Sequence, residues 1–187
     1  MGWSTTYKPP GIKATDYLLH HSGTFSWGPD CPATYKVLDT AIVNLKTFYA
    51  AVERIDKTTG ERMVWAAVCL LGYWPKSDNE NFGWKSMDES MGPCEASCPE
   101  RILKLLTPMT NEYAIEWRAR CWTKIEARRA RPKIKVGSTL KLYGKPYLVL
   151  ELNAYGKAGW RVKGDDGTIY FASHVKLRQA ADIKDPV

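Results

Sequence analysis

The nearly uninterrupted apolar segment MVWAAVCLLGYW, residues 63–74, restricts the fold more than any other feature of the chain. Its twelve residues are too few to span a bilayer as a helix, which takes about 20 residues. It is rich in aromatic and branched side chains, and a strand that is apolar on both alternating faces must be covered on both sides. The segment therefore predicts a central strand buried on both faces, although its Ala-Ala pair also permits a helix.

The preceding residues extend this prediction to a hairpin. TAIVNLKTFYAAVERID, residues 40–56, has the composition of a strand, and DKTTG at residues 56–60 follows it as a turn. Gly60 can adopt the positive φ that a tight turn requires. We therefore expect a long antiparallel hairpin, with strands before and after this turn.

Three segments predict helices. IKATDYLLHH at residues 12–21 and CPERILKLLTP at residues 98–108 predict short helices. The strongest prediction is a helix over residues 111–131, where the side chains that we expect to be buried step by four along one side. These side chains are Tyr113, Trp117, Cys121 and Ile125, with Trp122 beside them.

Charge is distributed unevenly along the chain. Residues 118–178 contain 15 Lys and Arg against 4 Asp and Glu, whereas residues 1–117 contain 11 against 14. A basic excess confined to one region is typical of a surface that meets phosphate or another acidic partner. The alternative is a solvated basic face that serves solubility alone.

Residues 133–178 have the pattern of a second, all-β module. Four short alternating segments, TLKLY, PYLVLEL, GWRVKG and IYFAS, are separated by glycine-containing turns. VGSTLKLYGKPYLVLEL and GWRVKGDDGTIYF resemble SH3-like barrels, including the KOW-type modules of nucleic-acid-associated proteins. The resemblance implies a small closed or half-closed barrel, a fold that serves RNA, DNA and protein partners alike. The chain is thus expected to be α+β, with an α+β domain over residues 1–131 and a small barrel with a tail over residues 132–187.

The segment PKSDNENFGWKSMDESMGPCEASCP, residues 75–99, is predicted to be a long polar connection. Long connections inside compact domains are often functional, so we considered a ligand site within residues 78–93. Its candidate residues are Asp78, Glu80, Trp84, Lys85, Asp88 and Glu89. The carboxylates could hold a divalent cation, but a hydrated acidic loop is the simpler interpretation, since their spacing matches no known motif. Cys94 and Cys98, a close cysteine pair, could supply half of a zinc site, but the sequence contains no second matching pair.

The order of NFGWKSMDESMGP, CPERILKLLTP, EYAIEWRARC and RPKIKVGSTLKLYGK resembles that of a family of small proteins carried by bacteriophages and by conjugative or integrative elements. The resemblance implies a genomic setting shared with DNA-handling and anti-defence proteins. It implies no catalytic residues, because no activity is established for that family. No nucleotide-binding, zinc-protease or hydrolase motif is present in the sequence, and we expect neither a cofactor nor a metal.

These observations favour a cytoplasmic, non-enzymatic accessory protein that binds the phosphate backbone of nucleic acid and does not bind membranes. The expected contacts are Arg118, Arg120, Lys124, Arg128, Arg129, Arg131, Lys133 and Lys135, with Trp160 and Tyr170 as stacking candidates. For both aromatic residues, core packing is the alternative. A second hypothesis is an inhibitor of a host defence complex, of the anti-restriction or anti-CRISPR type. A third is a metal-dependent enzyme that uses residues 78–93.

Overall fold

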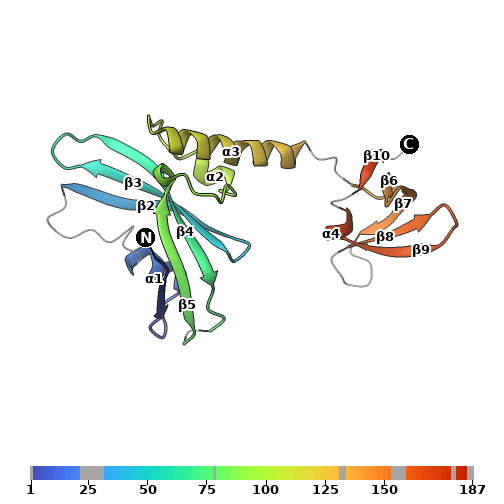
Figure 1. Cartoon of the computed structure of the whole chain (residues 1–187), viewed down its shortest axis with the longest axis horizontal. Coiled ribbons are helices and arrows are strands. Elements are labelled where there is room, and N and C mark those ends of the chain that lie inside the picture. Colours follow the sequence, from blue (N-terminus) through green and yellow to red (C-terminus); the bar gives the residue numbers. More distant parts are fainter. Residues whose placement is uncertain are drawn as a thin grey trace. The chain divides into compact units, whose positions relative to one another are not determined.

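The chain folds into two compact α+β units, Met1–Arg128 and Arg129–Val187 (Figure 1). The computed structural model describes residues 2–21, 32–77, 79–130, 134–152, 159–177 and 180–184. The sequence placed the boundary between domains after residue 131. No helix within the described residues is long and apolar enough to cross a membrane.

The first unit contains a five-stranded antiparallel sheet in the order β1-β5-β4-β3-β2. Its strands are β1 (Ser4–Tyr7), β2 (Ala33–Val43), β3 (Thr47–Asp56), β4 (Arg62–Tyr73) and β5 (Asn81–Asp88). β4 lies in the middle and is buried along most of its length, which confirms the predicted central strand. The predicted hairpin is formed by β3 and β4, and Gly60 has a φ of 73° in the turn between them.

The prediction of one strand over residues 40–56 was wrong, because a second hairpin turn interrupts it. β2 ends at Val43, and the amide of Lys46 donates to the carbonyl of Val43 at 3.0 Å. Asn44 and Leu45, the two central residues of this turn, both have a φ of 53°, which is the left-handed conformation of a type I′ turn. Asn adopts this conformation readily and Leu does not, so the sequence carries only half of the usual turn signal.

The prediction of a continuous loop over residues 75–99 was also wrong, because β5 lies within it. β5 pairs with β4 on one side and with β1 on the other. Phe82 and Trp84 point to one face of the sheet and are buried there, while Met87 packs against the opposite face. The polar residues that suggested a loop are compatible with a strand that lies near the edge of the sheet.

Helices cover both faces of this sheet. α2 (Glu100–Leu103) and α3 (Glu112–Arg129) pack on the face that carries Tyr49 and Val68. α1 (Ala14–His21) places Leu18 on the other face, against Phe48 and Phe82. A short 3₁₀ helix, η1 (Glu89–Met91), follows β5.

The buried side of α3 agrees with the predicted spacing except at its first position. Trp117, Cys121 and Ile125 are buried as expected, but Tyr113 is 64% exposed and Ala114 is buried in its place. The buried side of α3 therefore begins at Ala114, one residue later than the sequence predicted. An alanine gives a weaker hydrophobic signal than a tyrosine, although here it lies closer to the core.

The second unit is also built on a five-stranded antiparallel sheet, in the order β10-β6-β7-β8-β9. Its elements are β6 (Thr139–Leu142), β7 (Lys145–Leu152), β8 (Gly159–Gly164), β9 (Ile169–Ser173), α4 (His174–Leu177) and β10 (Ala181–Lys184). The four segments that predicted strands correspond to β6–β9, and β10 lies in what the sequence suggested was a tail. Within the described residues, β9 and β10 are the edge strands, and no pairing between them closes a barrel.

Candidate nucleic-acid interface

Arg118, the first predicted phosphate contact, is directed into the first unit. Its Nε and Nη2 atoms donate to the two carboxylate oxygens of Glu89 at 2.6 and 2.7 Å, and Nη1 donates to the carbonyl of Thr107 at 2.6 Å. Glu89 is fully buried and the Arg118 side chain is only 16% exposed. This placement removes Arg118 from the predicted phosphate contacts, because its donors already have partners inside the protein.

The same carboxylate completes the hydrogen bonding of β4. Glu89 also accepts from the amide of Ala66 at 2.9 Å, just beyond the point where β5 stops pairing with β4. Two residues before Ala66 on β4, the carbonyl of Val64 accepts a hydrogen bond from the amide of Thr107 at 3.0 Å. The ion pair therefore holds four parts of the unit together: β4, η1, α3 and the segment that follows α2.

The remaining predicted residues of α3 become more exposed toward its end. Arg120 is half-buried and donates to the carbonyl of Pro93 at 2.9 Å, so only part of it is available to a ligand. Lys124, Arg128 and Arg129 are exposed, and all of residues 126–130 are exposed as well. Arg131 and Lys133 lie outside the described residues. The end of α3 is thus the basic part of this helix that faces solvent.

The predicted ligand residues of the 78–93 segment do not converge on one site. Trp84 is buried on the α1 side of the sheet, whereas Lys85, its neighbour in β5, points to the opposite side. Asp88 accepts from the amide of Ser90 at 2.8 Å and caps η1. The carboxylate of Glu80 accepts from the amide of Lys76, Glu89 is paired with Arg118, and Asp78 lies outside the described residues.

Within the described part of the chain, no three His, Cys, Asp or Glu side chains come together in a way that could hold a metal ion. Cys94 is exposed and Cys98 is buried. The buried Cys98 thiol has its pKa raised, mainly through desolvation.

The second unit carries the whole formal net charge of the protein. Its sequence contains twelve Lys and Arg against five Asp and Glu, which gives +7, whereas the first unit contains fifteen of each. Coulomb attraction to a polyanion grows with such an imbalance, and at physiological ionic strength it is strongest within about 8 Å. The arrangement of these charges on the sheet therefore determines what the unit can bind.

One face of the second sheet is solvent-exposed and carries basic and apolar side chains together. Strand register places Thr139, Leu148, Lys163 and Ile169 in a row across β6, β7, β8 and β9. Arg161 of β8 and Phe171 of β9 are paired in a second row beside the first. Lys141 lies on β6, two residues after Thr139. We call this surface the outward face, and define it by Thr139, Lys141, Leu148, Glu151, Arg161, Lys163, Ile169 and Phe171.

The opposite face of the sheet forms the core of the unit, which explains the alternation along each strand. Leu140, Val149 and Val162 are buried there. Trp160 belongs to the same core and is 8% exposed, so core packing, the alternative considered for it, is what the structure contains. A base could not stack on this ring without disrupting the unit.

Tyr170 lies at the margin of the core and is 43% exposed. Its ring meets that of Tyr147 edge to face at 5.8 Å, and its hydroxyl donates to the carboxylate of Asp166 at 3.2 Å. The amide of Thr168 donates to the same carboxylate at 2.8 Å, and these bonds lower the pKa of Asp166. Tyr170 is therefore accessible, but it lies next to a firmly ionised carboxylate that would repel phosphate.

The sequence prediction did not include the basic residues of the outward face. Lys141 and Lys163 are exposed, and Arg161, two residues before Lys163 on β8, is paired with Phe171 of β9 in the register. The alternation within TLKL and GWRVKG could have identified these residues. In each strand the basic side chains point to one face of the sheet and the buried apolar side chains point to the other. Lys135, which the sequence did select, is exposed at the start of this unit.

Comparison of the chain with protein-family models, with curated proteins and with solved structures found no match.

Proposed function

We propose that the protein binds nucleic acid through the outward face of its second unit. The observation that carries the proposal is that the unit with all of the net charge presents Lys141, Arg161 and Lys163 on one exposed sheet face. Phosphates pair with such side chains and release condensed counterions, which makes binding strong at low salt. Leu148, Ile169 and Phe171 lie among these charges and offer apolar contact to sugars and bases.

The strand order supports interpreting this unit as an SH3-like barrel. Neighbours along the chain pair from β6 to β9, and the last strand, β10, returns to β6 after the short helix α4. In such a barrel the outward face would lie on the exterior, available to an extended partner. Arg128 and Arg129 supply further positive charge at the end of α3.

The test is binding of fluorescently labelled single-stranded and double-stranded DNA and RNA to the full chain at several salt concentrations. Lys141→Glu/Lys163→Glu should weaken binding about 10-fold or more and lower the salt slope by about two. Arg128→Glu/Arg129→Glu should also weaken it. The matched control, Lys46→Glu/Lys57→Glu, reverses two exposed lysines in turns of the first unit and should retain affinity within about twofold.

Two results would overturn the proposal. One is a wild-type chain that retains none of the four nucleic acids at low salt. The other is equal loss of affinity in the outward-face variant and in the control, because net charge alone would then explain binding.

A second candidate is a protein partner with an acidic or nucleic-acid-mimicking surface, as expected for an inhibitor of a host defence complex. The exposed apolar chains of the outward face favour this candidate, because a protein partner would bury them. Retention of a partner from host lysate after nuclease treatment, lost in Leu148→Asp/Ile169→Asp, would support it. Loss of all retention after nuclease treatment would leave nucleic acid as the partner.

A further inference from the structure

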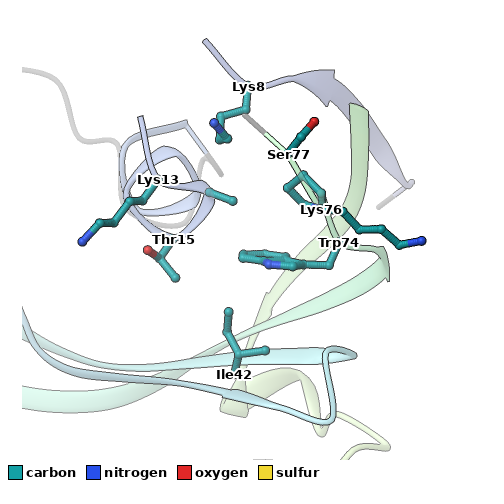
Figure 2. A pocket seen from close by; sticks show the side chains of 9 residues that line it. Lys8, Lys13, Thr15, Ile42, Trp74, Lys76 and Ser77 are labelled. Atoms are coloured by element: carbon teal, nitrogen blue, oxygen red, sulfur yellow. The ribbon is translucent and has the colours of Figure 1, made fainter. Parts of the chain in front are cut away.

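A pocket of about 500 Å³ lies in the first unit, where four segments of the chain meet (Figure 2). They are the residue that follows β1, the start of α1, the end of β2 and the segment after β4. The pocket is lined by Lys8, Lys13, Ala14, Thr15, Ile42, Trp74, Pro75, Lys76 and Ser77. It is separate from the outward face, which belongs to the other unit.

The lining is cationic and rich in hydrogen-bond donors. It includes three lysines and two hydroxyl groups, and none of the described residues that line it is acidic. Lys8 is only 4% exposed, so its charge acts from a largely water-excluded position, where electrostatic interactions are strongest. α1 begins at Ala14, and the positive end of its helix dipole lies beside this lining.

Trp74 supplies a flat apolar wall. Its ring packs against the core and meets Phe82 edge to face at 5.9 Å, which fixes its orientation. In Figure 2 the ring lies between Ile42 and Lys8, and the ammonium groups of Lys13 and Lys76 extend to opposite sides of the pocket. A buried cation and an aromatic wall in one pocket, with two exposed cations at its rim, suit a ligand that is planar at one end and anionic at the other.

We propose that this pocket binds a mononucleotide, with the base against Trp74 and the phosphate beside Lys8. An ammonium has three donors, so Lys8 can contact a phosphate in addition to its interaction within the protein. The volume falls within the range of about 300–1,000 Å³ typical of small-molecule sites. The hydroxyls of Thr15 and Ser77 offer further bonds to phosphate or ribose.

The nucleotide could be free or could be the phosphorylated end of a strand, and both present the same chemistry. Calorimetric titration of the full chain should therefore compare AMP and GMP with a 5′-phosphorylated dinucleotide, the unphosphorylated dinucleotide, adenosine and inorganic phosphate. We expect saturable binding of AMP or GMP, and of the dinucleotide only when it is phosphorylated. Equal affinity for AMP and the phosphorylated dinucleotide would identify the strand end as a ligand, whereas a strong preference for AMP would identify the free nucleotide.

Variants test the two contacts separately. Lys8→Met should weaken AMP binding at least 10-fold and leave adenosine unchanged, whereas Trp74→Leu should weaken both. Ser77 is exposed, and Ser77→Glu places a negative charge at the pocket. This variant therefore tests the phosphate contact if Lys8→Met does not fold. Its matched control is Thr58→Glu, in an exposed turn of the same unit.

Absence of saturable AMP and GMP binding at millimolar concentration, or equal affinity in wild type, Lys8→Met and Ser77→Glu, would overturn the proposal. Failure here is distinguishable from failure of the proposed function. Lys141→Glu/Lys163→Glu should leave AMP binding unchanged, and Ser77→Glu should leave salt-dependent binding of long nucleic acids unchanged.

Discussion

The two units of the chain differ in how far their own acids balance their bases. In the first unit arginines are paired with acids of the same unit, as in Arg118–Glu89, Arg101–Asp39 and Arg54–Asp56. In the second unit the acids are too few to balance the bases, and Lys141 and Lys163 lie exposed on the outward face. A basic sequence segment thus indicates a binding surface only after the arginines that stabilise the fold have been subtracted.

The largest effect is expected where this internal pairing is buried. Glu89→Ala or Arg118→Ala should each lower the free energy of unfolding of the first unit by about 3–5 kcal/mol, because the remaining charge stays buried without its partner. The double variant should lower the free energy of unfolding by less than the sum of the two single losses. Urea unfolding of the full chain measures the change, and thiol labelling of Cys69, Cys98 and Cys121 assigns it to the first unit, where all the cysteines lie.

The control for these variants is Glu126→Ala, an exposed carboxylate on the same helix. It should change the free energy of unfolding by less than about 0.5 kcal/mol. Additive losses in Glu89→Ala and Arg118→Ala would contradict the interpretation that the two residues act as a pair.

Local patterns predicted the parts of the fold whose signal lies within one element. The four-residue spacing of Trp117, Cys121 and Ile125 was sufficient to predict α3, and the apolar run with Gly60 was sufficient to predict the β3–β4 hairpin. The turn at Asn44 and Leu45 escaped detection, because Leu rarely adopts a positive φ.

The parts that the sequence could not predict depend on partners distant in the chain. β5 alternates polar residues with apolar ones, and its two buried aromatic residues identify a strand only once β4 and β1 flank it. Likewise, what distinguishes Arg118 from Arg128 is its contact with Glu89, which lies 29 residues before Arg118 in the chain. The pocket beside Trp74 is assembled from four separate segments, so no contiguous motif marks it.

A smaller effect is expected from a change confined to the second unit. A Cβ atom at Gly159 would lie 2.5 Å from the ring of Phe171 and 2.7 Å from the backbone oxygen of Ala172. Gly159→Ala should therefore force β8 and β9 apart and lower the stability of this unit by about 1–3 kcal/mol. Hydrogen exchange of the β8 and β9 amides should accelerate, while thiol labelling in the first unit stays unchanged.

Gly2→Ala is the control for that variant, since no atom of the described residues, apart from the chain neighbours, lies within 4 Å of the added Cβ. Nucleic-acid binding by Gly159→Ala should weaken in proportion to the fraction of the second unit that is unfolded. Slower exchange in β8 would contradict the predicted clash at Gly159, and faster thiol labelling in the first unit would show that the change is not confined to the second unit.

The smallest effect tests the outward face itself. Glu151 lies 3.4 Å from Arg161, and its side chain is 52% exposed while that of Arg161 is 36% exposed, so Glu151→Gln should change stability by less than about 1 kcal/mol. The same variant removes the one carboxylate among the residues that define the outward face, and nucleic-acid binding should tighten about two- to fivefold at low salt. The gain should disappear as salt is raised, because it arises from charge and not from a new contact. Glu112→Gln, an exposed acid of the first unit, is the control and should leave affinity unchanged. Weaker binding by Glu151→Gln would mean that Glu151 holds Arg161 in its binding position, and the outward face would then depend on an internal ion pair, as the first unit does.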